Sequence, residues 1–287
     1  MAEAPGHRLG QIIGDALELA VEPMLRSFAE EYDLYLDKKG PRPVRPGLKC
    51  TWVDNLGNAH DLDFVLERGG TPTKIGKPAA FVETAWRRYT KHSRAKAQEI
   101  QGAILPLLAT HSNVMPFAGT VVAGRWTAGA LQQIRSSGLS VLHIEYKEIV
   151  DVFTAAGVDI DSEEATPDAY LQEQVDAWLA LTGDEKGAVG EALRACASER
   201  FASFRQDLAG AISRLVQRVT VLPLHSVAVE CASVTEAIAM IVSYVPPAMT
   251  PQLVRFEVII RYTNGDRIDA QFGSAIGAMD FLRTFAT

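Results

Sequence analysis

The sequence predicts an α/β protein in which a mixed sheet is flanked by helices, followed by a helical insert and a small α+β C-terminal domain. Over residues 1–155, short apolar runs bounded by turn residues alternate with segments of helical periodicity. Residues 156–217 have the apolar spacing of helices throughout. Residues 218–287 return to short strands, and Asn264-Gly265 between two of them is a strong hairpin signal. The 287 residues are enough for one large domain or two.

The first predicted elements are a helix and a pair of strands. Apolar residues recur at helical spacing over residues 8–32. Residues 37–47 are basic and rich in proline, which indicates an irregular connection. Strands are predicted over 48–54 and 59–67, and the four residues between them contain Gly57 and two asparagines. These two strands are therefore expected to form a hairpin.

The rest of the first segment is predicted to alternate between strands and helices. In order, these are a strand over 78–86, a helix from Thr90 or Ser93 to about 104, a strand over 116–123, a helix over 128–137 and a strand over 140–146. Thr127 is a suitable N-cap for the second helix, and Gly138 marks its end. The last strand–helix–strand unit is a crossover, so its two strands are expected to be parallel.

The C-terminal segment is predicted to be a small βαββα unit. Its expected elements are a strand over 219–229, a helix over 234–244, hairpin strands over 256–262 and 267–272, and a helix over 275–285.

Composition indicates an ordinary globular protein of the cytoplasm. About half of the residues are apolar, no apolar run is long enough to span a bilayer, and the N-terminus lacks the pattern of a signal peptide. The three cysteines, Cys50, Cys196 and Cys231, are far apart and form no CxxC pair. They are expected to be reduced thiols, and their spacing excludes a cysteine-based zinc site.

Charge is unevenly distributed along a chain whose net charge is −7. Residues 84–98 contain five bases and no acid, whereas residues 159–191 contain ten acids and one lysine. A local basic face on an acidic body is compatible with DNA binding through phosphate contacts. The alternative is a solvated helix face. The five bases are Arg87, Arg88, Lys91, Arg94 and Lys96.

Two predicted strands carry carboxylates where buried strands usually carry aliphatic residues. Asp61 and Asp63 lie in the run that continues as Phe64-Val65, and Glu83 lies in the next strand. Carboxylates on neighbouring strands can share a hydrated Mg²⁺, which prefers oxygen ligands. The alternative is that they are strand-edge charges that face water. With the basic segment that follows, the pattern favours metal-dependent phosphodiester hydrolysis.

The order of helix, hairpin, strand and helix, with Asp63 on the second strand and Glu83 on the third, resembles the PD-(D/E)xK nuclease superfamily, which includes type II restriction endonucleases. The resemblance covers roughly residues 8–147. It implies a restriction-endonuclease-like sheet, a nuclease core at 1–155, and a Mg²⁺-dependent DNA endonuclease in which Mn²⁺ can substitute. It also implies a homodimer on double-stranded DNA, a setting such as phage defence, and recognition or dimerisation by residues 218–287.

The resemblance assigns Asp63 and Glu83 as catalytic metal ligands, but the motif lysine is replaced by Ala85. Either a base from elsewhere takes its place, with Lys91 favoured over Lys96 and Arg87, or the protein binds DNA or a partner without cutting. Further residues are suggested for supporting roles. The additional metal-ligand candidates are Asp61 and Glu18, and the candidate DNA-binding residues are Arg87, Arg88, Lys91, Arg94, Lys96 and Gln98.

Overall fold

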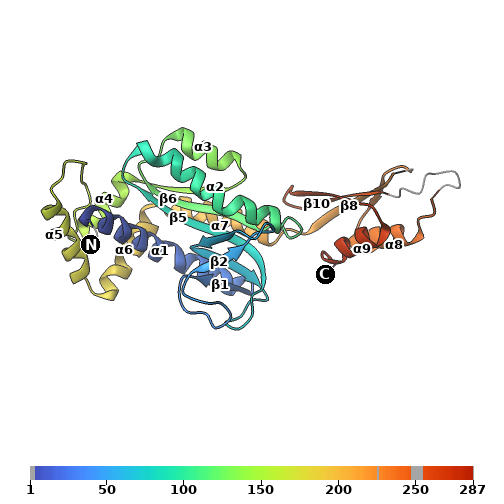
Figure 1. Ribbon diagram of the computed structural model, residues 1–287, viewed down its shortest axis with the longest axis horizontal. Coiled ribbons are helices and arrows are strands. Elements are labelled where there is room, and N and C mark those ends of the chain that lie inside the picture. The colour runs from blue at the N-terminus through green and yellow to red at the C-terminus, as the bar shows by residue number, and fades with distance from the viewer. Residues whose placement is uncertain (1–3, 225, 247–254, 287) are drawn as a thin grey trace. The chain divides into compact units, whose positions relative to one another are not determined.

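The computed structural model describes residues 4–224, 226–246 and 255–286. The chain forms two compact units, Met1–Ala209 and Gly210–Thr287, each with its own main sheet (Figure 1). All three cysteines are free thiols. Across the described ranges, no helix combines the length and the apolar character needed to cross a membrane.

The first unit is built on a mixed five-stranded sheet, which confirms the predicted α/β class. Its strand order is β1-β4-β5-β6-β7. The pairs β1/β4 and β4/β5 are antiparallel, whereas β5/β6 and β6/β7 are parallel, as the predicted crossover requires. The strands are β1 (Leu34–Lys38), β4 (Phe64–Arg68), β5 (Lys77–Arg87), β6 (Phe117–Gly124) and β7 (Ser140–Glu145).

Helices flank this sheet. α2 (Ser93–Thr110) and α3 (Ala128–Ser136) contribute to one apolar cluster with Phe81 and Val122 of the sheet. Thr127 caps α3 as predicted, because its hydroxyl oxygen accepts the Ala130 N–H at 3.2 Å. α1 packs against β1 and β5. Its bounds are Pro5–Glu31, and a short 3-10 turn, Thr90–His92, precedes α2.

The remaining helices of the first unit follow β7. α4 (Tyr146–Ala155) was not predicted, although its apolar spacing is helical. The predicted helical segment 156–217 forms α5 (Asp168–Ala180), α6 (Gly183–Cys196) and α7 (Ser198–Ile212). α5 and α6 pack against α1, so they belong to the same compact unit as the sheet.

The predicted strand 59–67 is two strands that belong to different sheets. β3 (Ala59–Leu62) pairs with β2 (Cys50–Val53) in a two-stranded sheet, and β4 pairs with β1 and β5. The chain bends at Asp63 between them. The bend is stabilised because the Asp63 carboxylate accepts hydrogen bonds from Thr84 of β5 instead of continuing the ladder.

Strand β1 was missed, and the basic connection after it has a structural role. The Arg42 guanidinium is buried and donates to Glu67 at 2.6 and 3.0 Å and to Asp37 at 2.8 Å. Arg45 also donates to Asp37 at 2.8 Å. Buried charges require such complete pairing. Arg42 therefore bridges β1 and β4, and Arg45 pairs with the β1 carboxylate of the same network.

The second unit contains a four-stranded antiparallel sheet of order β11-β10-β8-β9. The predicted strand 219–229 is two strands, and the predicted hairpin at Asn264-Gly265 is confirmed, with Gly265 at φ 92°. The elements are β8 (Val216–Pro223), β9 (Val229–Cys231), α8 (Val234–Ser243), β10 (Phe256–Tyr262), β11 (Arg267–Phe272) and α9 (Ala275–Arg283).

Candidate functional site

The candidate site lies where one edge of β5 loses its strand partner. The β4–β5 ladder begins with Phe64 opposite Val82. Beyond Val82, β5 continues to Arg87 with β6 on one side. In the described part of the chain, no strand pairs with its other edge there. Side chains near this edge are therefore not covered by a further strand of the described chain.

Asp63 and Glu83 meet at this edge. The Asp63 N–H lies 3.3 Å from Oε1 of Glu83, to which it donates. The Thr84 N–H and hydroxyl each donate to Oδ2 of Asp63 at 2.7 Å. Asp63 thus lies where β4, if it began one residue earlier, would be paired with Glu83. Its carboxylate is held by Thr84, the residue that follows Glu83.

Glu83 is strongly perturbed by its surroundings. Burial raises its pKa well above the ordinary value, and the nearby charge of Asp63 raises it further, with a smaller contribution from Glu18. The Asp63 N–H and the Lys96 ammonium lower it. The side chain is only 9% exposed. Close, desolvated carboxylates that repel one another are characteristic of sites that bind protons or cations.

Glu18 of α1 belongs to the same group of acids. Burial, followed by repulsion from Asp63 and Asp15, raises its pKa to about 7, although Lys39 and Lys38 act in the opposite direction. The predicted role of Glu18 as an additional ligand stays a prediction, but the structure brings it into electrostatic contact with both strand acids.

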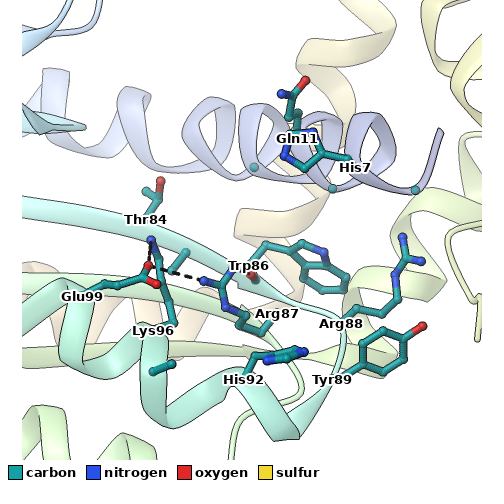
Figure 2. Close-up of a pocket in the computed structure, with 15 residues that line it drawn as sticks. His7, Gln11, Thr84, Trp86, Arg87, Arg88, Tyr89, His92, Lys96 and Glu99 are labelled. Atoms are coloured by element: carbon teal, nitrogen blue, oxygen red, sulfur yellow. Dashed lines mark hydrogen bonds and ion pairs between the residues drawn. The ribbon is translucent and has the colours of Figure 1, made fainter. Parts of the chain in front are cut away.

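A base of α2 lies within electrostatic range of Glu83. Lys96 acts on the Glu83 carboxylate, and its Nζ lies 3.0 Å from Glu99. Arg87 lies 3.6 Å from the same Glu99 carboxylate. Figure 2 shows these three side chains together below β5, while His7 and Gln11 project from α1 on the other side.

Several other candidate residues lie elsewhere. Lys91 is exposed and contacts Glu164 of the acidic segment at 2.9 Å. Asp61 is held in the β2–β3 hairpin by Lys49 at 2.5 Å and Thr51 at 2.6 Å. Gln98 is exposed on α2. The structure therefore places Lys96, rather than Lys91, beside the carboxylates.

Two basic candidates flank the end of β5. Arg88 lies 6.0 Å from the Tyr89 ring centroid and lines a pocket between α1 and the end of β5. Arg94 is exposed in the first turn of α2. No described carboxylate forms an ion pair with either side chain, so both remain available for an anion.

A pocket of about 580 Å³ adjoins the carboxylates. It lies between α1, the end of β5 and the start of α2, and its lining includes Thr84, which donates to Asp63, and Lys96, whose charge lowers the pKa of Glu83 (Figure 2). On α1 its wall contains Gly10 and Gly14, where an added Cβ would meet nothing within 4 Å. The pocket has room for a nucleotide-sized group beside five basic side chains, namely His7, Arg87, Arg88, His92 and Lys96.

Asp63 and Glu83 fit the requirements of a hard divalent cation. Mg²⁺ commonly uses one or two protein carboxylates and completes its shell with water and phosphate oxygens. A cation between the two acids would offset the repulsion that raises the pKa of Glu83. Within the described ranges, no three His, Cys, Asp or Glu side chains form a ready-made metal site. Protein ligation would therefore depend on this pair.

Sequence reasoning missed three groups at this site. The sequence assigned no role beside these carboxylates to Thr84, Lys39 or Glu99. Thr84 donates a hydrogen bond to the Asp63 carboxylate, and the charge of Lys39 lowers the pKa of Glu18. Glu99 forms an ion pair with Lys96. The position of Thr84 directly after Glu83 was the only local sign of its role, because strand alternation alone places the two side chains on opposite faces. The roles of Lys39 and Glu99 depend on the tertiary packing around the sheet.

The comparisons with known proteins leave the site without an assigned role. No family model matches this chain, and no curated protein matches it. A solved structure described as that of Protein of Unknown Function AF1548 matches with 9% identity and a TM-score of 0.27, covering 67% of this chain and 99% of that chain. No family is shown by these comparisons.

Proposed function

We propose that this protein is a Mg²⁺-dependent DNA endonuclease with a restriction-endonuclease-like core. The observation that carries the proposal is the meeting of Asp63 and Glu83 at the open edge of β5. Lys96 is close enough for its charge to lower the pKa of Glu83. The mixed sheet and the flanking helices α1 and α2 are compatible with the resemblance drawn from the sequence.

The chain's own residues would divide the work of phosphodiester hydrolysis. Asp63 and Glu83 would hold the cation, and Thr84 would keep Asp63 in place. When bound, Mg²⁺ supplies an acidified water and offsets negative charge on the phosphate. Lys96 would take the role of the lysine that Ala85 replaces, by orienting the attacking water or the phosphate. Arg87 and Arg88 would contact neighbouring phosphates.

Partners follow from the reaction. Cutting both strands of double-stranded DNA generally calls for two active sites, so a two-fold homodimer is proposed. Mn²⁺ is expected to replace Mg²⁺, because both accept carboxylate and water ligands. A role in defence against phage DNA is proposed on the resemblance alone.

A cleavage assay tests this proposal. Supercoiled plasmid and phage DNA are incubated with the protein in Mg²⁺, Mn²⁺ or EDTA. Wild type is expected to nick or cut in either metal, whereas Asp63→Asn and Glu83→Gln should lose at least about a hundredfold in rate. Asp61→Asn is the matched control, because Asp61 is engaged by Lys49 outside the site. Cleavage that survives both site variants would end the proposal.

A second function is favoured by one departure from the nuclease pattern. Ala85 stands at the motif lysine, and Lys96 is engaged by Glu99 at 3.0 Å. A protein with this core could bind DNA or a partner without cutting. DNA retardation that both site variants retain, with no metal-dependent product from any substrate, would support this second function over the first.

A further inference from the structure

The sheet of the second unit has two different faces. α8 packs against β8 and β9, and α9 packs against β10 and β11, so both helices lie on one face (Figure 1). Val219, Val221, Val258 and Ile260 are fully buried and alternate with the residues of the opposite face. Because successive side chains of a strand point to opposite faces, the intervening residues form a surface that α8 and α9 do not cover.

Three arginines form one row across this open face. Arg218 of β8 is directly opposite Arg261 of β10, and Arg261 is directly opposite Arg267 of β11. Neighbouring strands lie about 4.8 Å apart, so the row brings three cations within about 10 Å. Like charges at directly opposed positions destabilise a sheet. The row is an arrangement that a bound anion would stabilise.

The arginine at the centre of the row has no counter-ion among the described residues. Arg218 contacts Glu230 at 2.8 Å, and Arg267 contacts Asp269 at 2.7 Å, both as exposed pairs. Such pairs are weak and exchange readily. The Arg261 side chain is exposed and forms no hydrogen bond or ion pair within the part of the chain that the structure describes. Acids on the face lie in other rows, so the charges are segregated along the strands.

We propose that Arg218, Arg261 and Arg267 bind consecutive phosphate groups of a nucleic-acid backbone. The planar guanidinium presents two parallel donors that match a phosphate, and all three members of the row are arginine rather than lysine. The row ends at a hollow of about 420 Å³ that Arg218 lines together with Gln217 and Ala232, which gives space for a sugar or base.

The choice of nucleic acid over other polyanions rests on the proposed nuclease function. The two ideas are nevertheless separable, because binding by the row requires neither metal nor cleavage. A nucleic acid is also a polyanion whose charges repeat regularly along a chain, as the three cations do across the strands.

Binding measurements test the inference on the full chain. Fluorescence anisotropy is recorded in EDTA, in a Glu83→Gln background that prevents cutting, with labelled duplex DNA, single-stranded DNA and single-stranded RNA. Arg261→Gln removes the central cation. Arg283→Gln is the matched control, because Arg283 is an exposed arginine of α9 that pairs with Asp280. Circular dichroism checks that both variants are folded.

Arg261→Gln is expected to weaken binding of at least one of these nucleic acids about tenfold. It should also lower the slope of log affinity against log salt by about 0.7 to 0.9. Arg283→Gln should change affinity by less than about twofold. The comparison among the three probes identifies which form of backbone the row prefers.

Three results would overturn the inference. They are the absence of any nucleic-acid binding by the parent protein, equal effects of the two variants, and Arg261-dependent binding of polyglutamate or anionic vesicles in place of nucleic acid. Arg261-dependent binding by a chain that never cuts would retain the inference and end the proposed nuclease function. Cleavage by a protein whose nucleic-acid binding does not depend on Arg261 would retain the proposed nuclease function and end the inference.

Discussion

The raised pKa of Glu18 makes the stability of the first unit depend on pH. Burial and the charge of Asp63 raise this pKa from 4.5 to about 7. Because the folded protein then binds the proton more tightly than the unfolded chain, the contribution is most favourable below pH 4.5. It declines as the pH rises through about 7. Glu18→Gln replaces the acid with a neutral group of the same shape and should remove this dependence.

The size of the effect follows from the change in pKa. The difference between 4.5 and about 7 corresponds to about 3 kcal/mol at about 1.4 kcal/mol per pKa unit. Solvent screening of a partly exposed carboxylate reduces this to about 1 to 2 kcal/mol. Between pH 5 and pH 8, wild type is therefore expected to lose about 1 to 2 kcal/mol of unfolding free energy relative to Glu18→Gln.

Urea denaturation followed by tryptophan fluorescence measures this loss. All four tryptophans, Trp52, Trp86, Trp126 and Trp178, lie in the first unit, so the signal reports that unit alone. The measurements are made in EDTA. Glu30→Gln, an exposed acid of the same helix, is the control and should follow wild type. Stability curves of wild type and Glu18→Gln that stay parallel from pH 5 to pH 8 would refute the reasoning.

Three further outcomes are expected. Lys96→Met should slow plasmid cleavage about a hundredfold or more, whereas Lys91→Met should have little effect; equal losses would contradict the assignment of Lys96. Arg42→Met should cost about 3 to 5 kcal/mol in urea denaturation, because it leaves buried carboxylates unpaired; a loss below about 1 kcal/mol would argue against the network. Saturating Mg²⁺, at about 100 times its Kd, should stabilise wild type by about 2.7 kcal/mol but not Glu83→Gln, and equal stabilisation of both would place the metal elsewhere.

Much of the sheet was predictable because its signals are local. The parallel crossover, the cap at Thr127 and the hairpin at Asn264-Gly265 each depend on a few neighbouring residues, and each is present. The break at Asp63 was not predictable, because apolar residues continue through it. The hydrogen bonds from Thr84, a residue distant in sequence, determine that the chain bends there.

Strand β1 escaped prediction for a related reason. Its five residues lead directly into a basic, proline-rich connection whose composition indicates irregular structure. The burial of this region depends on Arg42, whose partners Asp37 and Glu67 are separated from it by 5 and 25 residues. Local composition contains no sign of such pairing.

The choice among basic residues also required the structure. Lys91 lies in a short 3-10 turn and forms an ion pair with Glu164 of the acidic segment. Lys96 lies in α2, where its charge lowers the pKa of Glu83. Spacing in the sequence does not determine which of these two lysines lies close to Glu83 of β5. The same limit applies to Glu18, whose position over β5 depends on how α1 packs.

The central claim is that Asp63 and Glu83 hold one divalent cation. Anomalous diffraction from a crystal soaked in Mn²⁺ tests this most directly, with a Glu83→Gln crystal as the control. A single peak within about 2.0 to 2.6 Å of an oxygen of each carboxylate, absent from the control, is the expected result. Mn²⁺ bound elsewhere, or no peak between the two acids in wild type, would contradict the claim.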